Sequence, residues 1–120
     1  MGFEKFTKTR ARGYVPKASI WSRGQIGFNK GAAEKYNLNN FLYAILFYDK
    51  DNKQIGIKFT NDENEEGEIK ITRRPAGGMS ISAKAFLDFY GIEHQKTTKC
   101  NMHYDKENDL YVLKEIKNTK

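Results

Sequence analysis

The chain has 120 residues, of which 38% are hydrophobic and 30% charged, enough for one compact domain but too few for two. A single cysteine excludes an intramolecular disulfide, and no apolar run is long enough for a membrane span or a signal peptide, so we expect a cytoplasmic protein that does not interact with membranes. The formal net charge of +6 favours an acidic partner, most often nucleic acid, over a neutral metabolite.

Charge is distributed unevenly along the chain. Residues 1–24 carry six cations and one acid, whereas residues 49–69 carry seven acids and three lysines. A polyanion is therefore expected to meet one basic face of the molecule rather than its whole surface.

The first half of the chain predicts two strands, a short helix and a hairpin. Residues 1–13 carry cations without a helical stripe, which indicates a basic N-terminal arm or an edge strand. The segment from Tyr14 to Arg23 favours extended chain, and Gly24 permits a sharp turn. The elements that follow are a strand at 25–28, a helix capped by Asn29 and running to about Tyr36 with Ala32, Ala33 and Tyr36 on its apolar face, a left-handed stop at Asn37, and strands at 41–48 and 54–59 around a turn-rich loop.

The second half predicts the same order of elements after an acidic loop at 61–67. A half-exposed strand is expected from Glu68 to Arg74, followed by a flexible turn that ends at Gly77 and Gly78. The elements that follow are a strand at 79–81, a helix capped by Ser82 and spanning 84–90 with Phe86, Phe89 and Tyr90 on its apolar face, a stop at Gly91, and strands at 98–104 and 110–116.

One sequence pattern occurs twice. Tyr48 to Asn52 (YDKDN) recurs as Tyr104 to Asn108 (YDKEN), at an offset of 56 residues, while the helix segments align at an offset of about 54. Each copy is preceded by a glycine, a short strand and a small amphipathic helix. The chain is therefore interpreted as one domain made of two ββαββ units, at about 14–60 and 67–117.

Each unit resembles the swapped-hairpin fold of the AbrB/MazE/SpoVT DNA-binding superfamily. The residues that carry the likeness are Gly24 to Lys30 (GQIGFNK) leading to Leu38, and Gly78 to Lys84 (GMSISAK) leading to Ile92. The resemblance covers residues 14–117 and implies an α+β, mainly β fold, in which duplicated units form one swapped-hairpin, double-psi-like barrel with two short helices. In the family two chains supply the two units, whereas here one chain supplies both.

The resemblance has one departure that bears on function. DNA-binding members usually carry a basic residue after the turn glycine, where this chain has Gln25 and Met79. Cations instead precede each turn, at Arg23 and at Arg73 and Arg74. The prediction of the fold depends less on this position than the prediction of DNA binding does.

A phosphate-binding surface needs several long cations on rigid elements. If a pseudo-twofold relates the units, we expect the turns with Arg23 and with Arg73 and Arg74 to lie at one end of the molecule as a basic, two-lobed surface. Trp21 and Tyr14 offer a second mode, stacking on unpaired bases. The alternative is solvated cations and a core aromatic. The predicted nucleic-acid-binding residues are Arg10, Arg12, Lys17, Trp21, Arg23, Lys30, Arg73, Arg74 and Lys84.

Other chemistry has little support. Cys100 and His103 have the spacing of half a zinc site, but no second pair exists and a strand places them on opposite faces. Nucleophilic catalysis by Cys100 would need a base such as His94 or His103, oriented by a third group that the sequence does not identify. The five acids from Asp62 to Glu68 lack the spacing of a calcium loop, which favours a solvated segment. We therefore predict no catalytic residue, no metal and no cofactor.

These patterns predict a non-enzymatic nucleic-acid-binding protein, with DNA favoured, that resembles AbrB-like transcriptional regulators of bacteria or phage. It is expected to be a monomer with an internal pseudo-twofold or a homodimer. The alternative is a protein-interaction module, antitoxin-like or inhibitory, that uses the acidic loop or exposed aromatics. A third interpretation is a small barrel that holds a ligand.

Overall fold

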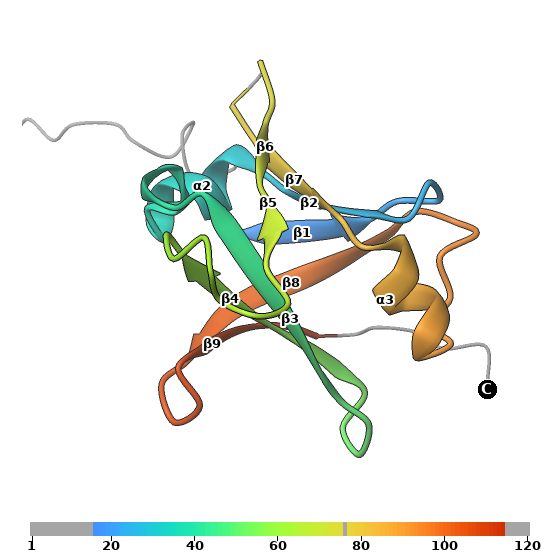
Figure 1. The fold of residues 1–120 in the computed structure, drawn as a ribbon. Helices are drawn as coiled ribbons and strands as arrows, with labels where there is room; N and C mark the ends of the chain where they lie inside the picture. The colour runs from blue at the N-terminus through green and yellow to red at the C-terminus, as the bar shows by residue number, and fades with distance from the viewer. Residues whose placement is uncertain (1–15, 76, 115–120) are drawn as a thin grey trace, which may run out of the picture.

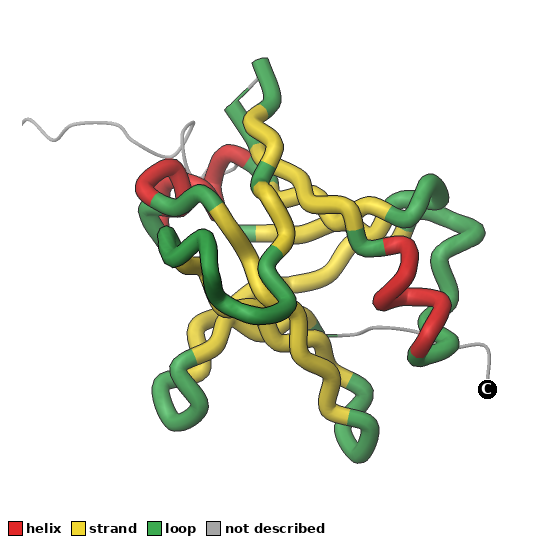
Figure 2. The backbone as a smooth tube through the Cα atoms, viewed as in Figure 1, coloured by secondary structure: helices red, strands yellow, loops and turns green. Residues whose placement is uncertain are grey.

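The computed structural model describes residues 16–75 and 77–114, so the expected arm at 1–13 lies outside the described residues. The described chain forms a nearly closed antiparallel barrel of nine strands with two short helices, which confirms the mainly β prediction (Figures 1 and 2). The elements are β1 (Lys17–Ile20), β2 (Gln25–Phe28), α2 (Lys30–Lys35), the 3-10 helix η1 (Leu38–Asn40), β3 (Tyr43–Asp49), β4 (Gln54–Thr60), β5 (Ile69–Lys70), β6 (Thr72–Arg73), β7 (Met79–Ser82), α3 (Lys84–Phe89), β8 (Thr98–Asp105) and β9 (Leu110–Leu113).

One short segment nearly closes the barrel. The strand order is β5-β3-β4-β9-β8-β1-β2-β7-β6, and the two end strands are separated in the chain only by Ile71. Ile71 is buried, and its N–H donates to the Leu42 carbonyl at 2.9 Å. We predicted a single strand from Glu68 to Arg74. This prediction was wrong because the chain changes partner at Ile71, pairing with β3 before it and with β7 after it.

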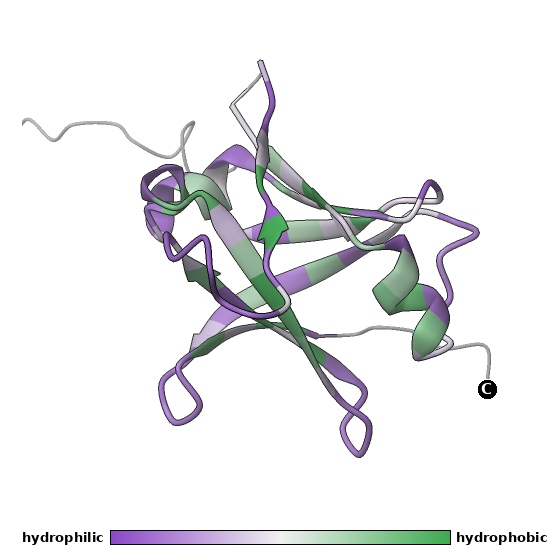
Figure 3. Ribbon diagram, in the orientation of Figure 1, coloured by the Kyte–Doolittle hydropathy of each residue, from purple (hydrophilic) through white to green (hydrophobic). Residues whose placement is uncertain are grey.

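The two long hairpins, β3–β4 and β8–β9, project together from the lower side of the barrel in Figure 1, and their turns are hydrophilic in Figure 3. Asn52 Nδ2 donates to Asp49 Oδ2 at 2.8 Å, and Asn108 Nδ2 donates to Asp105 Oδ2 at the same distance. These side-chain hydrogen bonds, first among several causes, lower the pKa of both carboxyl groups. The repeated sequence pattern thus builds the same turn twice.

Two tighter turns join β1 to β2 and β6 to β7. The Gly24 N–H donates to the Trp21 carbonyl at 2.9 Å, and the Gly77 N–H donates to the Arg74 carbonyl at 3.0 Å. Gly24 has a φ of 87° and Gly77 a φ of 104°, in the left-handed region that favours glycine. Both turns therefore have the form of a tight turn closed by a glycine, as we expected at Gly24 and Gly77.

Helix α2 begins and ends as the sequence predicts. Asn29 Oδ1 accepts the Ala32 N–H at 2.8 Å, which confirms the expected N-cap. Ala32 and Ala33 are buried on its inner side, and Tyr36 is half-buried. Asn37 follows in the left-handed conformation with a φ of 55°.

Helix α3 differs from expectation at its start and on its buried face. Ser82 does not cap it, because Ser82 is the last residue of β7, paired with Gln25; Ala83 takes the cap position without a side-chain hydrogen bond. The expected apolar face was right in part: Phe86 and Tyr90 pack against the core, but Phe89 is 79% exposed, and Leu87, which we did not predict, is the buried residue of the helix. The stop at Gly91 is confirmed by its φ of 66°.

Alternation along the strands sends one set of side chains into the barrel. The largest fully buried side chains are Ile20, Ile26, Leu38, Ile55, Ile57, Met79, Ile81, Leu87, Leu113 and Cys100.

Neither of the two α-helices in the described part of the chain has the length and the apolar composition of a membrane-spanning helix.

Candidate nucleic-acid interface

Strands β8, β1, β2, β7 and β6 are neighbours in the sheet and share one outer face. Residues directly opposite one another on paired strands point to the same side of a sheet. Across the middle of this face run Lys99, Ser19, Gly27, Ser80 and Thr72, each opposite the next. The interior side of the same strands is apolar, so this row lies on the outer side; Lys99 and Thr72 at its two ends are exposed, Ser19 is half-buried, and Gly27 and Ser80 are buried.

Two side chains from separate turns meet over this row. The Trp21 ring lies against Gly27, where an added Cβ would overlap the ring. The Arg74 guanidinium carbon lies 4.7 Å from the centre of the Trp21 ring, a cation–π contact. Trp21 and Arg74 precede opposite ends of the β2–β7 pair, so the two turns contribute to one site at its middle.

Further cations surround this contact. Lys17 lies two residues before Ser19 on β1 and is exposed, and Lys30 begins α2 and lines a cavity of about 240 Å³ together with Trp21 and Arg74. We call the surface formed by Lys17, Lys30, Lys99, Arg74 and Trp21 the basic face. Within the described part of the chain, none of its four cations forms an ion pair.

The other predicted cations lie elsewhere. Lys84 begins α3, with its Cβ against Gly24, and its Nζ pairs with Asp88 Oδ2 at 2.8 Å. The hydrogen bond from Lys84 is the main cause that lowers the pKa of Asp88. Arg23 is exposed in the turn beside Gly24. This end of the β2–β7 pair therefore carries a lysine that is already neutralised.

Arg73 faces away from the basic face. Its guanidinium donates to the Asn39 carbonyl at 2.5 Å and lies 3.4 Å from the Phe41 carbonyl, so it holds the loop that follows η1. A structural role for Arg73 is thus visible in its contacts.

Our prediction that the Arg23 and Arg74 turns lie at one end was wrong, because each turn precedes its strand in an antiparallel pair. Arg10, Arg12 and Tyr14 fall outside the described residues. Sequence reasoning missed Lys99, although its alternation with buried Cys100 on β8 marks it as outward-facing.

The residues considered for other chemistry do not form a site. Cys100 is 1% exposed, whereas His103 is half-buried on the opposite face of β8. Among residues 16–75 and 77–114, no group of three or more His, Cys, Asp or Glu side chains is placed to hold a metal ion.

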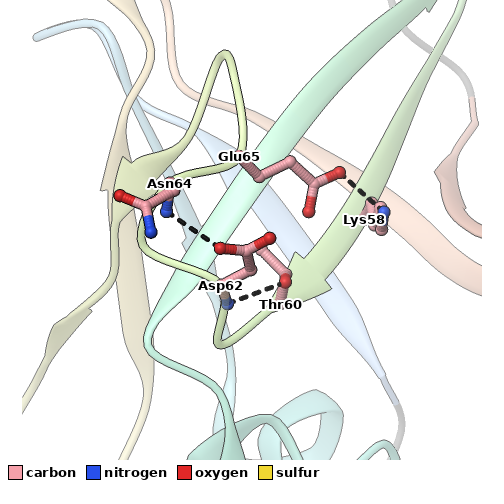
Figure 4. Close-up of polar contacts among 5 residues, drawn as sticks. All are labelled: Lys58, Thr60, Asp62, Asn64 and Glu65. Atoms are coloured by element: carbon pink, nitrogen blue, oxygen red, sulfur yellow. Dashed lines mark hydrogen bonds and ion pairs between the residues drawn. The ribbon is translucent and has the colours of Figure 1, made fainter.

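The acidic loop between β4 and β5 is organised by its own contacts (Figure 4). Lys58 Nζ pairs with Glu65 Oε2 at 2.7 Å, and this hydrogen bond is the main cause that raises the pKa of Lys58. The Asn64 N–H donates to Asp62 Oδ1 at 2.9 Å, and the Asp62 N–H donates to Thr60 Oγ1 at 3.0 Å. The loop thus packs one of its carboxylates against a barrel lysine and uses another within its turn.

No protein-family model matches the chain, and no significant match was found among curated proteins or solved structures.

Proposed function

We propose that this protein binds nucleic acid through its basic face, as a non-enzymatic regulator of the AbrB-like kind, with duplex DNA as its target. The observation that carries the proposal is the group of four cations on an outer sheet face, Arg74 against Trp21 with Lys17, Lys30 and Lys99 around it, none of which forms an ion pair within the described residues. Arg23 supports binding from the far end of the β2–β7 pair, where Lys84 contributes little because Asp88 neutralises it. Arg10 and Arg12 support binding from the N-terminal segment.

The physical basis of such binding is release of counterions from phosphates. Each phosphate that a lysine or arginine neutralises contributes about −0.9 to the slope of log K against log salt on a duplex. If all four cations of the basic face engage phosphates, the expected slope is roughly −3 to −4. Ser19 is half-buried and has a small side chain, so it leaves room for a phosphate group beside the Trp21–Arg74 contact.

The strand pairing supports the proposed architecture of two related units. Ile26 lies opposite Ile81, and Phe28 lies opposite Met79. An offset of 53 residues relates Ile26 to Met79 and Phe28 to Ile81. If each residue is replaced by its counterpart in the other unit, each of these two pairs becomes the other pair. A pseudo-twofold axis between β2 and β7 requires this self-consistency. The axis would pass beside Gly27, where Trp21 and Arg74 meet.

The pairing between the two long hairpins, through β4 and β9, shows the same symmetry. Ile55 lies opposite Leu113 and Ile57 opposite Tyr111, and a shift of 56 residues, from Ile55 to Tyr111, exchanges these two pairs. One segment departs from this symmetry. Strand β1 pairs with β2 on one side and with β8 on the other, whereas its counterpart in the second unit, residues 69–73, pairs with β3 before Ile71 and with β7 after it. The pairing therefore favours two swapped-hairpin units in one chain.

The test is fluorescence anisotropy of a labelled duplex across a salt series, with a single-stranded oligonucleotide of the same sequence alongside. We expect binding at low salt with a steep negative slope. The matched control is the variant in which Lys50 and Lys106, in the two projecting hairpin turns, are both changed to Ala. It removes as many charges as Lys17→Ala combined with Lys99→Ala, but only the latter pair should weaken binding. Absence of binding at low salt would contradict the proposal.

A second candidate function, a protein-interaction module, is favoured by one observation. Phe89 is 79% exposed on α3, and its ring meets the Tyr90 ring edge to face with the ring centres 4.9 Å apart. The Tyr90 ring in turn lies 4.7 Å from the Tyr48 ring. Such a supported aromatic is typical of an anchor that inserts into a partner. This candidate predicts a complex lost on Phe89→Ser and retained when Arg74 is changed to Ala, the opposite of the result expected for nucleic acid.

A further inference from the structure

Trp21 is the one tryptophan of the chain, and its environment limits what its ring can do. The ring is partly buried and rests against Gly27, so part of its surface is already covered by the strand. An aromatic that stacks on an unpaired base must present an open face. Here the ring is also in contact with a guanidinium, which competes for that face.

Arg74 gains a fixed position from this contact. Its N–H donates to the Gly78 carbonyl at 2.9 Å, which anchors the backbone, and the Trp21 ring supports the guanidinium at 4.7 Å. A guanidinium stacked on an aromatic keeps its N–H donors at its edge, where they match the oxygens of a phosphate in pairs. Because the side chain is already ordered, less conformational entropy is lost when it binds.

The cavity beside this pair has the chemistry of an anion site. Arg74 and Lys30 line it together with Ser19 and Asn29, and among residues 16–75 and 77–114 no acidic side chain contributes to its wall. The stem of Lys30 lies close to Gly77, where an added Cβ would be 3.2 Å from the lysine Cδ, so this lysine also has a defined course. The cavity measures about 240 Å³, room for one phosphate group.

We propose that this cavity is a subsite for a single phosphate group and that Trp21 is a positioning residue for Arg74 rather than a stacking platform for bases. The inference rests on the proposed nucleic-acid binding for the source of that phosphate, the backbone of a duplex. Inorganic phosphate shares the chemistry and is expected to occupy the same cavity more weakly, because it lacks the neighbouring phosphates that Lys17 and Lys99 would contact.

The test combines the fluorescence of Trp21, which reports this cavity alone, with anisotropy of the labelled oligonucleotide, which reports binding anywhere. We expect the duplex to change Trp21 fluorescence in parallel with anisotropy, and inorganic phosphate to change it at higher concentration than the duplex, with chloride at equal ionic strength as the reference. Anisotropy changes without any change at Trp21 would overturn the subsite while leaving nucleic-acid binding intact.

Variants separate positioning from stacking. Arg74→Lys keeps the charge but loses the planar fork, and Trp21→Leu keeps an apolar side chain but loses the ring. Each is expected to weaken duplex binding about fivefold, and the double variant is expected to bind no more weakly than either single variant, because both remove one unit. Lys106→Arg in the β8–β9 turn, outside the basic face, is the charge-retaining control and should bind as the wild type does. Circular dichroism and thermal unfolding verify that each variant is folded.

Two results would contradict the positioning role. If Trp21→Leu lost single-strand binding but kept full duplex affinity, the ring would act by stacking on bases. If Arg74→Lys bound the duplex with unchanged affinity, the planar guanidinium would not be needed for binding. If the wild type binds neither oligonucleotide, the proposed function fails. In that case a phosphate-specific change in Trp21 fluorescence that Arg74→Lys abolishes would retain the subsite as a site for free phosphate, and no such change would overturn it.

Discussion

The two helices, α2 and α3, both begin with a lysine in a similar backbone setting, but the two lysines have different partners. Lys30 begins α2 beside Gly77, and Lys84 begins α3 beside Gly24, at opposite ends of the β2–β7 pair. Lys84 is held by Asp88 at 2.8 Å, with His94 Nε2 3.5 Å from the same carboxylate. Lys30 has no such acid among the described residues and instead lines the cavity with Arg74. Similar backbone thus presents an unneutralised cation at one end and an ion pair at the other.

The capping residues differ in the same direction. Asn29 Oδ1 accepts both the Ala32 N–H at 2.8 Å and the Lys17 N–H at 3.1 Å, so it ties α2 to β1. Ala83 offers α3 no side-chain acceptor. The end that carries the basic face is therefore also the end whose helix is fastened to the sheet, which is the rigidity that a binding surface needs.

The largest expected effect tests whether the two helical regions support the barrel equally. Leu38 and Ile92 follow α2 and α3 and are 0% and 2% exposed. Changing either to Ala should lower the free energy of unfolding by about 2–5 kcal/mol, since each change leaves a cavity in the core. Urea denaturation of both variants measures this loss. If the two losses of unfolding free energy differ by more than about twofold, the two helical regions do not support the barrel equally.

The next largest effect is expected from removing the Asn29 side chain that caps α2. Asn29→Ala removes two hydrogen-bond acceptor contacts at the start of α2 and should cost about 1–2 kcal/mol. Asn39→Ala, at an exposed position of η1, is the matched control and should change stability by less than about 0.5 kcal/mol. Equal losses in both variants, measured by thermal unfolding, would show that the cap is not a source of the asymmetry.

The difference in charge gives a smaller effect on binding. Lys30→Ala should weaken duplex affinity about fivefold and reduce the salt slope by about 1, whereas Lys84→Ala should change affinity by less than about twofold. Asp88→Asn releases Lys84 from its ion pair and should strengthen binding about twofold. Anisotropy titrations measure all three. Equal effects of the two lysine changes would remove the asymmetry from the account.

The smallest effect concerns pH. The pKa of Asp88 is lowered, mainly by the hydrogen bond from Lys84 and partly by the charge of His94. Because the folded-state pKa lies below the unfolded value, the unfolded chain binds the proton more readily, and the stability contributed by this pair is lost as pH falls below 3.8. Between pH 6 and pH 3, the midpoint temperature of thermal unfolding should therefore fall less steeply in Asp88→Asn than in the wild type. Parallel profiles would show that the pair contributes nothing.

Local patterns predicted most of the secondary structure. The recurrence of Asp49 with Asn52 and of Asp105 with Asn108 predicted two similar turns, because each side chain bonds within its own turn. Helix α2 was predicted from its asparagine cap and alanine face, which are also local. Helix α3 was harder, since a helix of six residues exposes most of its surface and the spacing of Phe89 does not determine which side is buried.

The candidate site depended on contacts between distant segments. Trp21 and Arg74 belong to different turns, and their contact follows from the pairing of β2 with β7. Lys99 joins the basic face only because β8 pairs with β1. Arg73 and Arg74 are neighbours in sequence, yet one holds a loop and the other lies on Trp21, and composition alone does not distinguish them.

The most direct test of the account is two-dimensional NMR of nitrogen-labelled protein titrated with a short DNA duplex. The account predicts the largest shift changes at the Trp21 indole and at Arg74 and Lys30, weaker changes near Arg23, and none in the hairpin turns at 49–53 and 105–109. Changes confined to those turns, or centred on Phe89, would contradict binding through the basic face.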